Sequence, residues 1–147
     1  MFLKQTGRSM GGFTLIELLV VLVILGLLAS LAGPKVIGYL GGAKSDTARL
    51  QIEEFGASLD LFKLETGRYP STQEGLTALV QQPPGLAGWN GPYLKKKSLP
   101  KDPWGNDYRY ASPGQHGIYD ISSLGADAKE GGDGENKDIN SWEDGKK

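Results

Sequence analysis

Residues 13–33 read FTLIELLVVLVILGLLASLAG, and this stretch decides the fold. From Leu18 to Ala32 it carries no charged residue, and Ser30 is its one polar side chain. An α-helix of about 20 apolar residues is long enough to cross the hydrocarbon layer of a membrane, which is roughly 30 Å thick. We therefore predict a membrane-spanning helix near the N-terminus.

The short segment before this stretch predicts how the helix is oriented. Lys4 and Arg8 are its only charged side chains. Positive flanking charge keeps a helix end on the cytoplasmic side. We expect a single-pass protein with a cytoplasmic N-terminus and the remaining chain across the membrane.

Two interpretations of the apolar stretch remain open on these features. A secretory signal peptide also has a basic start, an apolar centre and small residues, such as Ser30 and Ala32, before its cleavage site. Glu17 argues against it, because a carboxylate in an apolar helix costs up to about 3 kcal/mol and usually marks a function. Snorkelling of Glu17 to the headgroups is the structural alternative. Gly11 and Gly12 leave the backbone before the helix flexible and open to a protease.

Composition excludes several classes of function. The 147 residues have the size of one ordinary domain, and a net charge of -1 gives no basic field for nucleic acid. With no cysteine, the chain has no disulfide, thiolate zinc site, iron–sulfur cluster or cysteine nucleophile. His116 is the one histidine, and the sequence holds no Gly-x-Ser-x-Gly elbow, phosphate loop or other complete catalytic set. We expect a protein that is not an enzyme.

The helical pattern resumes after Pro34, where we expect an interruption that marks the membrane exit. Apolar residues then recur at steps of four and three, which predicts a helix to about Thr66 with one face on a globular body. A coiled-coil partner fits less well because only about two heptads are kept. Gly67 predicts the C-terminal stop. The apolar stripe consists of Ala48, Ile52, Phe55, Leu59 and Phe62.

The remaining chain predicts a small α+β head. Ser71 and Glu74 have the spacing of a capping box, which predicts a short second helix to about Gln82. Residues 107–110 and 117–121 suggest two antiparallel strands joined through a turn at 112–114. The predicted architecture is a long N-terminal helix, first transmembrane and then amphipathic, packed on a head with short helices and a small antiparallel sheet.

An acidic, glycine-rich loop follows the second predicted strand. Oxygen ligands on a flexible backbone suit Ca²⁺, which takes roughly six to eight oxygens in forgiving geometry. The EF-hand frame is absent, and a solvated acidic loop is the alternative. The five carboxylates are those of Asp127, Glu130, Asp133, Glu135 and Asp138.

Residues 12–17, Gly-Phe-Thr-Leu-Ile-Glu, resemble the processing motif of type IV prepilins and pseudopilins. The resemblance implies cleavage after Gly12 by a prepilin peptidase, N-methylation of Phe13 and retention of the apolar helix. Glu17 would then pair with the ammonium group of an adjacent subunit in the filament, and Pro34 would let the helix loosen. The implied division is a leader at 1–12, a transmembrane and filament-core helix at 13–34 and a periplasmic head at 35–147.

The head resembles the major pseudopilin family of the type II secretion system. Residues 66–70 (TGRYP), 102–105 (DPWG), 112–117 (SPGQHG) and 123–127 (SLGAD) carry the resemblance in the order of that family. It implies an inner-membrane subunit that polymerises with itself into a periplasmic pseudopilus and drives folded proteins through an outer-membrane secretin. Further implied partners are minor pseudopilins and an inner-membrane assembly platform with a cytoplasmic ATPase; no nucleic acid is implied.

The same resemblance implies a structural calcium ion in the acidic loop. Asp127 and Asp138 would be side-chain ligands and Leu124 a backbone-carbonyl ligand, with Asp133 and Glu135 as further candidates in a segment of variable length. Two other functions remain open. A type IV or competence-type pilin would share the first 34 residues, and a secreted calcium-binding enzyme would have a cleaved signal peptide.

Overall fold

The computed structural model describes residues 11–143, which form two compact units. The first unit ends at Gly38 and the second begins at Tyr39. Helix α1 (Leu15–Thr66) contributes to both units. Most of the predicted leader, including Lys4 and Arg8, lies outside the described residues.

The first unit consists of the N-terminal part of α1, whose side chains are exposed. By its length and composition, α1 contains a segment apolar enough to cross a membrane, as the sequence predicts. The predicted interruption at Pro34 is absent, because the helix continues through this residue. A proline removes one backbone donor, and the flanking turns keep their own hydrogen bonds.

The second unit starts with the amphipathic part of α1. Its predicted apolar stripe is confirmed, since Ala48, Ile52, Phe55, Leu59 and Phe62 are all buried. The helix ends as predicted at Gly67, whose φ of 85° is left-handed. The Gly67 N–H donates to the carbonyl of Lys63 at 2.8 Å, which caps the last turn.

The segment after α1 forms the predicted capping box but not the predicted helix. The Glu74 N–H donates to Ser71 Oγ at 3.2 Å, and the Ser71 N–H donates to Glu74 Oε2 at 2.8 Å. Only a 3₁₀ turn, η1 (Leu76–Leu79), follows. Gly75 adopts a φ of 63°, which is incompatible with a right-handed helix and ends the capped turn.

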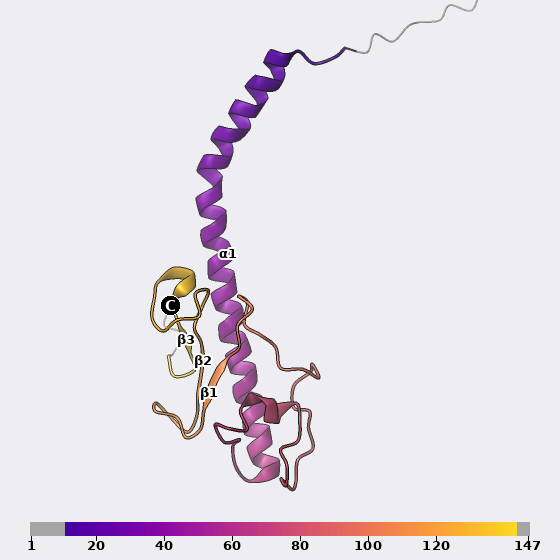
Figure 1. Ribbon diagram of the computed structural model, residues 1–147, viewed down its shortest axis with the longest axis vertical. Helices are drawn as coiled ribbons and strands as arrows, with labels where there is room; N and C mark the ends of the chain where they lie inside the picture. The colour runs from indigo at the N-terminus through magenta and orange to yellow at the C-terminus, as the bar shows by residue number, and fades with distance from the viewer. Residues whose placement is uncertain (1–10, 144–147) are drawn as a thin grey trace, which may run out of the picture. The chain divides into compact units, whose positions relative to one another are not determined.

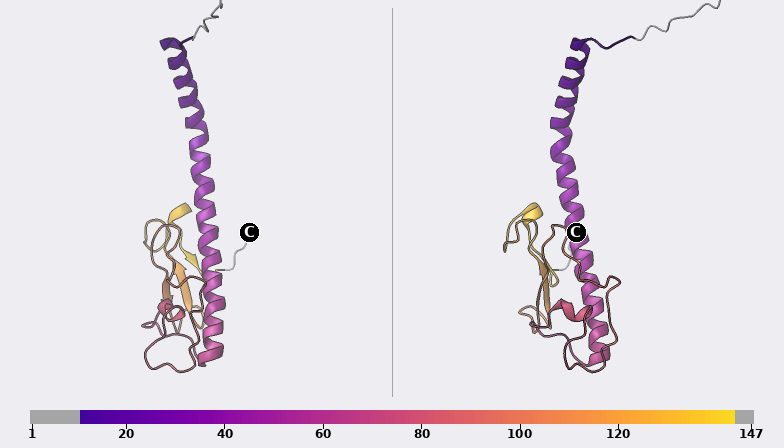
Figure 2. Two further views of the ribbon diagram at one scale, coloured as in Figure 1. Left: turned by 90° about the vertical axis from the view of Figure 1, so that its right-hand side faces the viewer. Right: turned by 45° about the vertical axis from the view of Figure 1, so that its right-hand side comes forward.

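Three short strands form one antiparallel sheet in the order β1-β2-β3. They are β1 (Arg109–Ala111), β2 (Asp120–Ser123) and β3 (Ile139–Asn140). The predicted antiparallel pair is confirmed, with Tyr110 opposite Ile121. Strand β3, which pairs with β2, was not predicted. Within this unit the sheet lies along one side of α1, as the views in Figures 1 and 2 show.

The core of the second unit lies between the α1 stripe and the chain that folds back over it. Phe55 meets Tyr108 edge-to-face at 5.0 Å between ring centroids, and Phe62 meets Tyr93 in the same way at 5.7 Å. Ile121 from β2 is fully buried in the same cluster. Aromatic pairs of this geometry contribute beyond the area that they bury, so they help fix the head on the helix.

The ion pair between Arg68 and Glu74 predicts a pH-dependent stability. Arg68 donates two hydrogen bonds to the Glu74 carboxylate, at 2.7 and 2.8 Å. Arg68 lowers the pKa of Glu74 to about 2, from an ordinary value of 4.5. The stabilisation is therefore complete above the unfolded pKa and is lost as the pH falls from about 4.5 toward 2.

We expect Glu74→Gln to lower the free energy of unfolding at pH 7 by about 1 kcal/mol or less, because the pair is partly exposed to solvent. Urea denaturation of the full chain in detergent, repeated from pH 7 to pH 2, measures this difference, which should shrink below pH 4.5. Glu53→Gln, at an exposed position on α1, is the control. A deficit of constant size across this range would contradict the interpretation.

Candidate functional site

The N-terminal motif forms the cap of α1. The Thr14 N–H donates to Glu17 Oε2 at 3.0 Å, and the Glu17 N–H donates to Thr14 Oγ1 at 3.2 Å. This reciprocal pair is a capping box, and the helix dipole favours a negative charge at this end. The sequence interpretation considered only the charge of Glu17, although the Thr-x-x-Glu spacing already signals a cap.

The backbone before the cap is open. Among the residues that the structure describes, a Cβ atom added at Gly11 or Gly12 would have no neighbour within 4 Å, and Phe13 is exposed. The peptide bond between Gly12 and Phe13 therefore lies in a segment that another protein can approach from several sides. The accessible Gly12–Phe13 peptide bond is thus followed, four residues after Phe13, by the Glu17 carboxylate that caps the helix.

The acidic loop, residues 124–138, closes on itself at Gly125. The Ala126 N–H donates to the Glu135 carbonyl at 2.8 Å, which joins the two ends of the loop. Gly125 has a φ of 70°, and a Cβ there would lie 2.6 Å from the same carbonyl oxygen. Only glycine allows this crossing without displacing the backbone.

A buried aspartate supports the base of the acidic loop. Asp102 Oδ1 accepts hydrogen bonds from the N–H groups of Trp104 at 3.1 Å and Asn106 at 2.8 Å. Asp102 Oδ2 accepts from the Ser123 hydroxyl at 2.7 Å. The Asn106 side-chain amide donates to the Gly125 carbonyl at 3.0 Å, so the turn at 102–106 holds the crossing point. The sequence interpretation missed these roles, since pairing between distant segments leaves no local pattern.

The structure separates the acids of the loop into two groups. Glu130 and Glu135 are directed at cations outside the loop, with Arg109 Nη1 at 2.8 Å from Glu130 and Lys44 Nζ at 3.9 Å from Glu135. Asp133 is exposed and directly precedes the 3₁₀ turn η2 (Gly134–Asn136). Across residues 11–143, no three histidine, cysteine or acidic side chains converge on one point.

Asp127 and Asp138 lie at opposite ends of the loop. Asp127 Oδ1 accepts the Lys129 N–H at 3.1 Å, and Asp138 Oδ2 accepts the Gly131 N–H at 2.9 Å. Asp138 Oδ1 is buried and has no hydrogen-bond partner among the residues that the structure describes. Leaving a carboxylate oxygen buried and unpaired is costly, so the site fits a cation in contact with that atom.

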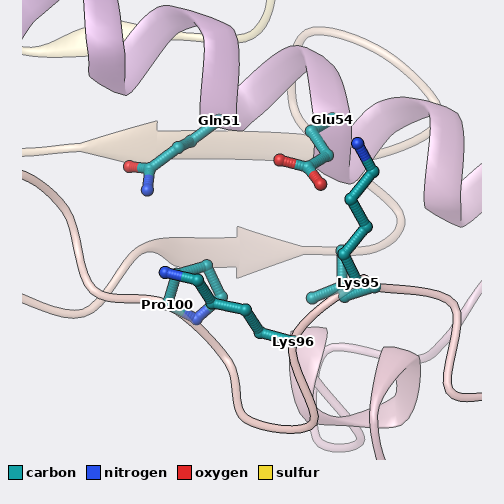
Figure 3. Close-up of a pocket in the computed structure, with 6 residues that line it drawn as sticks. Gln51, Glu54, Lys95, Lys96 and Pro100 are labelled. Carbon is teal, nitrogen blue, oxygen red and sulfur yellow. The ribbon is translucent and has the colours of Figure 1, made fainter.

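Two open hollows on the surface of the second unit bring charged side chains together. One, of about 230 Å³, lies between Gln51 and Glu54 of α1 and the loop with Lys95, Lys96 and Pro100 (Figure 3). An acid, an amide and two amines line this groove together with Leu94 and Pro100, so it carries charges of both signs beside apolar surface.

The second hollow contains His116, whose ring stacks on Trp142 at 3.9 Å between centroids. His116 Nδ1 lies 2.9 Å from Asp120 Oδ2. Burial opposes ionisation of Asp120, but hydrogen bonds from His116 and from the Gln115 N–H lower its pKa overall. Asp120 thus ties together the turn before β2, and the stack fixes Trp142 over it.

A capped apolar helix that is long enough to cross a membrane, followed by a small α+β head with a glycine-rich acidic loop, defines a pilin-like subunit. The sequence model of the family described as "Type II secretion system (T2SS), protein G" matches residues 35–142. The "Prokaryotic N-terminal methylation motif" matches residues 7–33. The chain belongs to the type II secretion system protein G family and is a major pseudopilin, a structural subunit and not an enzyme.

The individual relatives agree with this assignment. The chain is 50% identical over 140 residues to the type II secretion system core protein G of Pseudomonas aeruginosa, covering 92% of this chain and 97% of that protein. The core protein G of Vibrio cholerae is 46% identical over 138 residues, with 92% and 93% covered.

A solved structure has the same fold. The crystal structure of the major pseudopilin from the type 2 secretion system of enterohaemorrhagic Escherichia coli matches with a TM-score of 0.62 and 33% identity. The match covers 74% of this chain and 95% of that one. Because the family match includes the head, it favours a pseudopilin over the type IV and competence-type pilins that share only the N-terminal features.

The role of Asp102 gives a test of the loop base. We expect Asp102→Ala to lower the free energy of unfolding by about 3 kcal/mol, because it leaves the buried Ser123 hydroxyl and two part-buried backbone N–H groups without their acceptor. Urea denaturation of the full chain in detergent measures the loss. Asp107→Ala is a matched control because this exposed aspartate pairs only with Lys101 among the described residues, and it should cost less than about 0.5 kcal/mol. Equal losses in the two variants would refute a supporting role for Asp102.

Proposed function

We propose that the chain is cut after Gly12 by a prepilin peptidase, is N-methylated at Phe13 and polymerises with itself into a periplasmic pseudopilus. The observation that carries this proposal is the open Gly11-Gly12 segment directly before a capped apolar helix. The match of residues 7–33 to the methylation motif supports it. On this proposal, residues 1–12 are the leader, 13–34 the membrane and filament-core helix, and 35–147 the periplasmic head.

The proposed topology follows from the charge before the helix. Lys4 and Arg8 keep the N-terminus cytoplasmic, and the head lies in the periplasm. The subunit would enter the filament from the inner membrane, through an assembly platform with a cytoplasmic ATPase. Minor pseudopilins and the outer-membrane secretin complete the proposed set of partners, and the growing filament would move folded proteins through the secretin.

Glu17 has two roles in this proposal. Within one subunit it accepts the Thr14 N–H and caps the helix. Cleavage would create an ammonium group at Phe13, and burying that charge without a partner would be costly in a filament core. We propose that Glu17 of one subunit pairs with the ammonium group of the next and fixes the axial register.

Glu17→Gln separates the charge of Glu17 from the cap. Glutamine also serves as the third helical residue of a capping box, so the cap is kept while the negative charge is lost. We expect Glu17→Gln to insert into the membrane at normal levels but to form at least about tenfold fewer filaments, since a lost ion pair worth 1.4 kcal/mol or more changes an equilibrium by that factor. Filament yield in sheared fractions, compared with the amount of membrane-bound subunit, measures the split.

Thr14→Val is the control, because it removes the hydroxyl half of the cap and keeps the carboxylate. It should assemble better than Glu17→Gln. Wild-type filament levels in Glu17→Gln would disprove the pairing role. Mass spectrometry of the mature N-terminus tests processing, and a start after Ala32 in place of a methylated Phe13 would overturn the pilin-like maturation.

We further propose that the acidic loop binds one structural calcium ion. The ion would be held by Asp127, Asp138 and the Leu124 carbonyl. Asp133 is a further candidate ligand, because it is the other acid of this loop that is not paired with a cation among the described residues. The buried, unpartnered Asp138 Oδ1 supports this proposal. We do not include Glu135 among the proposed ligands, because its side chain lies against α1. When bound, calcium would neutralise these oxygens and fasten a loop that has no disulfide.

Thermal unfolding of the full chain in detergent, with calcium or with EGTA, tests the site. We expect calcium to stabilise the wild type by about 2.7 kcal/mol at a free concentration 100 times the dissociation constant. Asp138→Ala and Asp127→Asn should remove most of this increment, whereas Asp107→Ala, outside the loop, should keep it. Indifference of the wild type to EGTA would refute the calcium proposal.

A further inference from the structure

Helix α1 has a weak section between Gly38 and Thr47. Gly38, Gly41 and Gly42 each make a helix less stable than alanine would, by about 1 kcal/mol. The side-chain hydroxyls of Ser45 and Thr47 donate to the carbonyls of Gly41 and Ala43, which competes with the helical hydrogen bonds. Local sequence therefore does not explain why this section stays helical.

Gly41 is nevertheless buried, and it is the first buried residue along α1. The Glu135 side chain covers it: a Cβ at position 41 would lie 2.6 Å from Glu135 Cγ and 3.1 Å from Cδ. The neighbouring Gly42 has no such contact, because a Cβ there would meet no atom of residues 11–143 within 4 Å. The absence of a side chain at position 41 gives Glu135 its place on the helix.

Glu135 is itself held from the acidic loop. Its carbonyl accepts the Ala126 N–H across the loop base at 2.8 Å, and it lies in the middle of η2. Figures 1 and 2 show this short yellow coil beside α1. The carboxylate lies 3.9 Å from Lys44 Nζ, and this long, partly exposed pair contributes little by itself. The contact of Glu135 with Gly41 thus joins the acidic loop to the weak section of the helix.

We propose that Glu135 is a positioning residue that clamps the acidic loop onto α1 at Gly41 and holds residues 41–45 helical. The dependence of this clamp on metal rests on the proposed calcium site. An ion that orders the acidic loop would fix the position of Glu135, and Glu135 would in turn stabilise the helix at Gly41. Glu135 does not have to bind the metal ion to act as this clamp.

Amide hydrogen exchange of the full chain in detergent tests the clamp, read in peptides covering residues 39–47 and 126–138 under EGTA. Gly41→Ala and Gly42→Ala are a matched pair, since both add the same helix propensity and only the first displaces Glu135. We expect faster exchange at 126–138 in Gly41→Ala and no change there in Gly42→Ala. Equal exchange of the loop in the two variants would overturn the proposal.

A second pair tests the same contact from the loop. We expect Glu135→Ala to speed exchange at 39–47 about fivefold, the factor expected for a contact worth about 1 kcal/mol. Glu130→Ala, which removes an acid directed at Arg109, should leave those residues unchanged. Glu135→Gln should keep most of the protection, because it retains the carbon atoms that cover Gly41. Identical behaviour of Glu135→Ala and Glu130→Ala at 39–47 would also overturn the clamp.

Adding calcium separates this proposal from the proposed metal site. Calcium should slow exchange at 39–47 in the wild type and in Glu130→Ala but not in Glu135→Ala, while all three keep their thermal stabilisation by calcium. Loss of that stabilisation in Glu135→Ala would make Glu135 a ligand and refute the positioning role. If calcium stabilises none of the proteins, the metal site and the metal dependence fail together, and the EGTA comparisons alone decide the clamp.

Discussion

Burial of one apolar stripe on α1 is the interaction on which the head depends. Phe55, Leu59 and Phe62 are almost completely shielded from solvent, and the chain after Gly67 folds back to cover them. Each such side chain stabilises the fold by about 1.5–3 kcal/mol through removal of apolar surface from water. The small three-stranded sheet contributes Ile121 and Ile139 to the same cluster, so its position follows from the helix that it covers.

Because the head is small and has no cysteine, its long C-terminal loop needs other constraints. The structure supplies them through close approaches that only glycine permits and through one buried carboxylate. Gly125 lets the two ends of the loop cross, and Asp102 gathers donors from two segments beneath the crossing. Gly41 provides a third constraint, a contact between the loop and α1. In place of a disulfide, the fold uses backbone proximity and a network of charge-assisted hydrogen bonds.

The first part of α1 has a different requirement. Its exposed surface is apolar on all sides, which suits a lipid environment or a filament interior, where every backbone group must be satisfied within the helix. The one polar side chain pair at its start, Thr14 with Glu17, satisfies backbone donors that the helix itself cannot. The same carboxylate is then available near the terminus that processing would create.

Much of the fold could be predicted from particular residues. The stripe from Ala48 to Phe62, the stop at Gly67 and the antiparallel pair of β1 and β2 all follow from local periodicity and turn chemistry, and all are confirmed. The absence of an α-helix after Ser71 could not be predicted from the capping box alone, because it depends on the positive φ that Gly75 adopts in the folded chain. The acids of the loop were visible in the sequence, but their directions were not.

The sequence by itself therefore determined the apolar helix, its acidic residue, its amphipathic continuation and the family of the protein, because each of these depends on residue type at fixed spacing. Only the tertiary structure decided which acids face outward to Arg109 and Lys44, where Asp102 lies, and why position 41 is glycine. These features depend on contacts between segments far apart in the chain, and spacing along a sequence carries no record of such contacts.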